Sequence, residues 1–227
     1  MLTQGGVVCN WAFYERHFSS VRLQHYLNEA KDDKNRASDL YRWNVNISGA
    51  FWESFTYFEI GFRNAIDTQL ITRHSSHGRS GHWIFDDYYE LGRDQSDSQE
   101  HKQPYKDIAE AIRRVKQNKK LLKPEQIISE LSFGFWHQLV SQRQSFLWPD
   151  IATAFPYAPT RAQANIQDPI GRLRDLRNRI GHHHRIWSQN VSDKYKDMLL
   201  VAGYIDPNLA SFIESQSQVP NLMSKRP

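Results

Sequence analysis

The chain has 227 residues, of which 39% are hydrophobic and 13% aromatic, and its formal net charge is +4. This apolar content excludes a disordered chain and is enough for one large domain, while the positive balance permits an anionic partner without requiring one. There is no run of about 18 apolar residues, no secretory signal pattern, and a single cysteine, Cys9. We therefore expect a cytoplasmic protein without a membrane segment.

Apolar residues recur with helical spacing through most of the chain, and strand-like alternation is scarce, so the sequence predicts an all-α bundle. We expect an N-terminal extension at residues 1–18 and a single helical domain at residues 19–218. An irregular loop insertion at residues 72–104 interrupts this domain, and only there is a short hairpin expected. Residues 219–227 are polar and flanked by proline, which predicts a loose tail.

The first predicted helix begins at Ser19 or Ser20, because serine caps helix N-termini. The strongest helical pattern follows, with apolar residues every 3.6 positions from Leu40 to Leu70. A helix of some thirty residues is about 45 Å long, so it is expected to form the central spine. Glu59 and Arg63 lie four residues apart on it, the favourable spacing for an ion pair.

The insertion at residues 72–104 is rich in glycine, serine and aspartate, and loops of this length are functional or mobile. His74, His77 and His82 suggest a metal site at first. No cysteine accompanies them and their spacing fits no zinc pattern, so we expect surface histidines and no bound metal.

A basic helix is predicted from Tyr105 to Lys123. Residues 102–123 hold eight Lys or Arg against two acids. Such a face is either simply solvated or follows the phosphates of RNA. Under the second interpretation, the candidate RNA-binding residues here are Arg113, Arg114, Lys116, Lys119 and Lys120.

The next predicted helix begins at Pro124 and ends near Trp148, and its aromatic run at residues 133–136 indicates either core packing or stacking on bases. A further helix should begin at Asp168-Pro169, because aspartate caps a helix and proline suits its first turn. That helix runs to about Gly181, where the glycine would let the chain turn. Two more helices are expected from Ser192 and from Asp206.

The helix ending near Gly181 carries an unusual concentration of charge and imidazole. Between positions 161 and 185 the chain has six arginines against two carboxylates, and histidines occupy positions 182–184. Arg177 offers a permanent cation that binds phosphate bidentately, Asn178 an amide, and His182 a group that titrates near neutral pH. These three side-chain types suit RNA cleavage without a metal, in which a histidine transfers protons and an arginine binds the phosphate. Alternatively, they merely favour the helix macrodipole.

Residues 177–182 read R-N-x-x-x-H, the hallmark of the HEPN superfamily of helical nucleases and nucleotide-binding domains. Over roughly residues 20–220 the chain resembles the Abi-like (abortive infection) branch of that superfamily. The other segments that carry the resemblance are residues 41–44, 58–66, 130–136, 185–187 and 202–207.

The resemblance implies a HEPN-like bundle that forms a homodimer, in which two copies of the motif create one ribonuclease site for phage defence or toxicity. It implies that Arg177 binds the scissile phosphate, Asn178 orients it, and His182 is the general acid or base. His184-Arg185 departs from the family pattern, which leaves open whether His183 or His184 takes the part of His182. The implied supporting residues are Glu59, Arg63 and Asn64. Separately, the basic residues Arg174, Arg179 and Arg185 are further candidates for binding RNA.

Two other functions remain open at this stage. The same fold can bind RNA or a protein without cleaving anything, or it can be a structural protein whose histidine run binds a metal. Consecutive histidines point in different directions around a helix, which disfavours one shared ion. The leading hypothesis is therefore a ribonuclease without a cofactor that acts on RNA and has an antitoxin or regulatory protein as a further expected partner.

Overall fold

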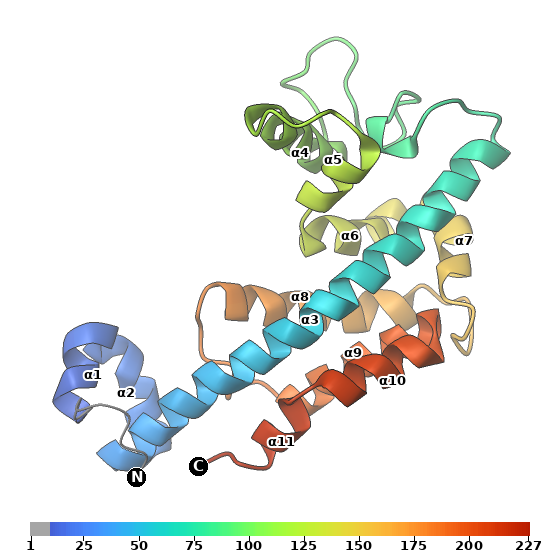
Figure 1. Ribbon diagram of the computed structural model, residues 1–227. Coiled ribbons are helices and arrows are strands. Elements are labelled where there is room, and N and C mark those ends of the chain that lie inside the picture. Colours follow the sequence, from blue (N-terminus) through green and yellow to red (C-terminus); the bar gives the residue numbers. More distant parts are fainter. Residues whose placement is uncertain (1–9) are drawn as a thin grey trace.

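The computed structural model describes residues 10–227, and within them every regular element is a helix (Figure 1). The all-α prediction is confirmed, and no strand forms in the described part of the insertion. Residues 1–9, with Cys9, lie outside the described residues. None of the helices in residues 10–227 is both long enough and apolar enough to cross a membrane.

Helix α3 (Lys34–Ser76) is the spine, and most of the other helices pack along it (Figure 1). Its 43 residues exceed the predicted span because Asp33 caps it earlier, accepting hydrogen bonds from the backbone N–H groups of Asn35 and Arg36. The predicted apolar stripe is buried, and Phe51, Phe58 and other large side chains of it form the centre of the core. Burial of this stripe fixes which face of α3 remains available for a site.

Helices α1 (Trp11–Phe18) and α2 (Ser20–Glu29) pack on the first turns of α3. Part of the expected extension is therefore helical. Asn10 caps α1, and Trp11 and Tyr14 are buried in contact with the core.

The last helices of the chain lie along the middle and the N-terminal part of α3 (Figure 1). Helix α8 (Ala164–Gly181) packs on α9 (Val191–Ile205), and α9 packs on α10 (Pro207–Gln216). The expected loose tail instead contains α11 (Val219–Met223), which contacts α3. Val219 is fully buried, and the Trp43 indole donates a hydrogen bond of 2.6 Å to the Leu222 carbonyl. These apolar and polar contacts hold a segment that composition alone predicted to be loose.

The continuous helix predicted from Pro124 to Trp148 is wrong. The segment forms α5 (Pro124–Glu130), α6 (Phe133–Leu139), a 3₁₀ turn (Gln142–Leu147) and α7 (Trp148–Ile151). Leu131 is extended, and Ser132 starts α6 by accepting a hydrogen bond from the Phe135 N–H. A serine cap thus competes with helix propagation. Helix α4 (Tyr105–Gln117) is shorter than predicted, because Lys119 adopts a left-handed conformation just beyond its end.

The insertion begins later than predicted, because α3 continues to Ser76. It is ordered around two carboxylates near the C-terminal end of α3, the buried Asp86 and the half-buried Glu90. Beyond α3 its regular part is one 3₁₀ turn (Trp83–Phe85). Asp86 accepts hydrogen bonds from the backbone N–H groups of Glu90, Leu91 and Arg93.

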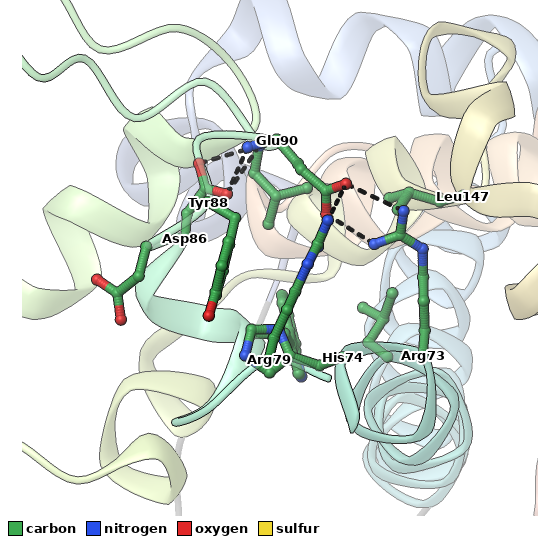
Figure 2. Close-up of a pocket in the computed structure, with 11 residues that line it drawn as sticks. Arg73, His74, Arg79, Asp86, Tyr88, Glu90 and Leu147 are labelled. Carbon is green, nitrogen blue, oxygen red and sulfur yellow. Dashed lines mark hydrogen bonds and ion pairs between the residues drawn. The ribbon is translucent and has the colours of Figure 1, made fainter. Parts of the chain in front are cut away.

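Figure 2 shows how the insertion is fastened to α3 through Glu90, which pairs with Arg73 of α3 and with Arg79. His74, expected at the surface, is instead buried and bonds the Ser80 carbonyl. These contacts hold the described part of the insertion against the bundle.

Candidate functional site

Helix α8 exposes part of the motif because its apolar face is buried against the bundle, which leaves the opposite face toward solvent. Leu173, Leu176 and Ile180 are buried, as predicted. The predicted start at Asp168 is wrong: α8 begins one turn earlier, at Ala164. Tertiary contacts hold this extra turn, since the side chain of Gln163 donates to the Val140 carbonyl and the side chain of Gln167 accepts from the Gln142 N–H.

Arg177 lies against α3, held at two points. Its ε-nitrogen donates a hydrogen bond of 3.3 Å to Glu59, and its guanidinium lies 4.9 Å from the ring centre of Trp52. No other hydrogen bond to this guanidinium is found within residues 10–227. Its terminal nitrogens are therefore available to an anion, in an orientation fixed by a carboxylate and an aromatic ring.

Arg177 lines a hollow of about 190 Å³ between α3, α6 and α8. Its lining residues are Trp52, Phe55, Thr56, Glu59, Ile60, Arg63, Leu131, Trp136 and Arg177. Burial raises the pKa of the Glu59 carboxyl, and the charges of Arg177 and Arg63 oppose that rise. The buried ε-nitrogen of Arg63 has no hydrogen-bond partner in the described structure. Two guanidinium groups thus face one carboxylate, so the hollow keeps a positive charge that suits an anion.

The three histidines lie where α8 ends, and all are exposed. The predicted end of the helix at Gly181 is confirmed, but the left-handed conformation falls on His183, with φ of 55°, and not on the glycine. The His182 N–H donates to the Asn178 carbonyl, and the His184 N–H donates to the Arg179 carbonyl at 2.7 Å. The chain therefore reverses within the histidine run.

The structure brings Arg177, Glu59 and Arg63 together, but it does not bring a histidine of the same chain into their hollow. His183 and His184 line a neighbouring groove of about 540 Å³, whereas His182 does not line it. The side chains of Asn178 and Asn64 are exposed and make no hydrogen bond within residues 10–227. Trp52 lines both spaces and connects them.

The other candidate RNA-binding arginines of the motif region are partly engaged within the chain. Arg174 pairs with Asp175 and lies 3.4 Å from His137. Arg179 donates to the Arg185 carbonyl at 2.7 Å, which secures the segment after the histidines.

The basic face of α4 lies near the other end of α3 from the helices α1 and α2 (Figure 1). There Arg113 pairs with Glu110, while Arg114 and Lys120 lie within 4 Å of Glu130. Lys116 and Lys119 have no ion pair among the described residues. Part of this charge is therefore neutralised inside the chain.

Sequence reasoning missed Trp52, which shares no motif with Arg177 and precedes it by 125 positions. Trp52 lies off the buried apolar stripe of α3, and its side chain is 42% exposed. Residues 10–227 contain no cluster of three or more His, Cys, Asp or Glu side chains placed to hold a metal ion.

These features define the chain as an all-helical protein with a basic, histidine-bearing helix end beside a hollow lined by Arg63 and Arg177. A family comparison identifies it further: the model of the Abi-like protein family matches residues 8–188, so the chain belongs to the Abi-like family. Neither the curated proteins nor the solved structures gave a significant match. Membership in this family suggests a role in abortive infection.

Proposed function

We propose that the chain is a metal-independent endoribonuclease of the HEPN type, acting in phage defence or as a toxin. A histidine removes the proton from the ribose 2′-hydroxyl, whose oxygen then attacks the neighbouring phosphorus. The bond from phosphorus to the 5′-oxygen breaks, and that oxygen takes up a proton as it leaves. The products are a 2′,3′-cyclic phosphate and a 5′-hydroxyl, and no metal is required.

The observation that carries this proposal is the state of Arg177 within the R-N-x-x-x-H motif. A carboxylate and an aromatic ring hold it, and its terminal nitrogens are unbonded within the described structure. A hydrogen-bond donor that is already oriented before the substrate binds can stabilise the negative charge that develops on the phosphate without reorganising. Such stabilisation is often the largest catalytic contribution. Asn178 and His182, one and five residues further on, complete the expected set.

We also propose a homodimer. The hollow of Arg177 contains no histidine of its own chain, while the histidines of α8 are exposed at the surface. A second copy placed with its α8 end against this hollow would supply the missing imidazole. An antitoxin or regulatory protein covering the same surface would then restrain activity.

RNA binding without cleavage is the second candidate. The separation of the histidines from the hollow of Arg177 favours it, because proton transfer needs the imidazole within hydrogen-bond reach of the ribose.

The test is cleavage of a labelled single-stranded RNA in the presence of a chelator. We expect Arg177→Ala and His182→Ala to reduce the rate by roughly 100-fold or more while the protein stays folded in a thermal unfolding assay, since neither side chain belongs to the core. His183→Ala and His184→Ala serve as matched variants, because both lie in the same exposed run. If one of these abolishes cleavage while His182→Ala does not, the general acid or base is reassigned. If purified protein leaves RNA intact, the ribonuclease proposal is wrong.

A further inference from the structure

A groove of about 540 Å³ adjoins the hollow of Arg177, with Trp52 as their common wall. Residues from α2, α3 and the end of α8 line it. Its volume lies within the range of about 300–1,000 Å³ typical of small-ligand pockets. The groove is therefore large enough for a group of nucleotide size beside any phosphate bound by Arg177.

One wall of the groove is apolar and exposed. Val45 is 54% and Trp52 is 42% exposed, although both are large hydrophobic side chains. Gly49 lies between them on α3, and a Cβ atom added there would meet nothing within 4 Å. The missing side chain leaves open space next to an indole, which suits a flat aromatic ligand.

The residues that line the groove from α2 and from the end of α8 include basic side chains. Arg22 of α2 lines it together with His183 and His184. Arg179 and Arg185 line the adjoining depression, which shares these three residues. Among residues 10–227, no carboxylate lines either space. The matching ligand therefore combines a flat apolar ring with negative charge.

We propose that this groove binds the base of the nucleotide adjacent to the phosphate on Arg177, so that the substrate is single-stranded RNA with that base stacked against Trp52. The identity of the polymer rests on the proposed ribonuclease function. A base inside the groove cannot remain paired in a duplex, and sequence-tolerant stacking on an aromatic side chain is how proteins commonly hold single strands. Arg22 and the histidines then lie near the phosphate on the other side of the base.

Gly49 allows a test that leaves Arg177 and its partners untouched. Gly49→Phe fills the groove with a ring, whereas Gly49→Ala adds only a methyl group and favours the helix, since alanine is the better helix former. Val45→Glu is a second variant, because a carboxylate there repels phosphate without filling the space. Binding is measured for a 2′-O-methyl RNA oligonucleotide, which cannot be cleaved, and for an abasic oligonucleotide of the same length and charge.

We expect the wild type and Gly49→Ala to bind the oligonucleotide with bases roughly 5- to 100-fold more tightly than the abasic one. Gly49→Phe should lose this preference and keep its affinity for the abasic strand, and Val45→Glu should weaken binding to both. Equal preference in Gly49→Phe and the wild type would overturn the inference. So would a wild type that binds both strands equally, or a change in oligomeric state caused only by Gly49→Phe, which would assign the groove to a subunit interface.

Cleavage of unmodified RNA separates this inference from the proposed function. A wild type that cleaves RNA but shows no base-dependent binding keeps its function and loses the base site. A wild type that shows the base preference but never cleaves RNA keeps the site and loses the ribonuclease function.

Discussion

The ion pairs of Glu90 give the most quantitative prediction, which concerns Glu90→Gln. Hydrogen bonds from Arg79 and Arg73 lower the pKa of the Glu90 carboxyl from 4.5 to about 2. One pKa unit corresponds to about 1.36 kcal/mol, so the native contacts of the ionised carboxylate contribute on the order of 3 kcal/mol. The side chain remains 27% exposed, and solvent screening brings the expected value closer to 2 kcal/mol.

The sign of the pH dependence follows from the direction of the shift. The folded pKa lies below the unfolded one, so the stabilisation is fully present above about pH 4.5 and disappears as the pH falls towards 2. Glu90→Gln lacks this titration. The difference in free energy of unfolding between wild type and variant should therefore be about 2 kcal/mol at pH 7 and shrink steadily in acid.

Urea unfolding at a series of pH values, followed by circular dichroism, measures this difference. Glu100→Gln is the matched control, because Glu100 is an exposed glutamate of the same insertion with no ion pair among the described residues. A difference that stays constant from pH 7 to pH 2.5 would refute the reasoning, since it would mean that Glu90 does not titrate with a lowered pKa.

Three further predictions concern other parts of the chain. Glu59→Gln should lower RNA cleavage roughly tenfold through looser positioning of Arg177, equivalent to about 1.4 kcal/mol, and an unchanged rate argues against that role. Asn44→Ala should lower the unfolding free energy by about 1–3 kcal/mol, because the buried amide oxygen accepts from two backbone N–H groups; urea unfolding tests this. Reversing the charges of Lys116 and Lys119 together should weaken RNA binding and flatten its salt dependence, whereas unchanged affinity at low salt assigns this face to solvent.

The parts of the fold that depend on long-range periodicity were predictable. The stripe of α3 and the buried face of α8 have the same 3.6-residue repeat of apolar residues. This repeat can be recognised in the sequence because every position on a buried helix face requires an apolar side chain. The break at Ser132 was not predictable in this way, since a single capping hydrogen bond redirects the chain. Asp86 likewise organises its loop through contacts that have no pattern in sequence.

The relation of Arg177 to the histidines shows a similar limit. Residues five apart on a helix project roughly 140° apart, so a motif read linearly does not place its first and last members together. The left-handed conformation of His183 also changes the direction of the chain after α8, and residue spacing does not predict this change. The motif therefore nominated candidate residues, and only the fold showed that Arg177 lines a different space from His183 and His184.

The candidate site has a pattern of its own on α3. Gly49, Trp52, Thr56, Glu59 and Arg63 are separated by three, four, three and four residues, so they share one face of that helix. This face has the same period as the buried stripe. Its residues differ in chemistry, however, from a glycine and an aromatic ring to a hydroxyl, a carboxylate and a guanidinium. A hydropathy pattern therefore does not reveal it. Since the end of α8 meets α3 along this face, α3 supplies both a wall of the groove beside Trp52 and the partners of Arg177. A second periodic face of mixed chemistry, next to a buried one, is thus the sequence signal that would have identified Trp52.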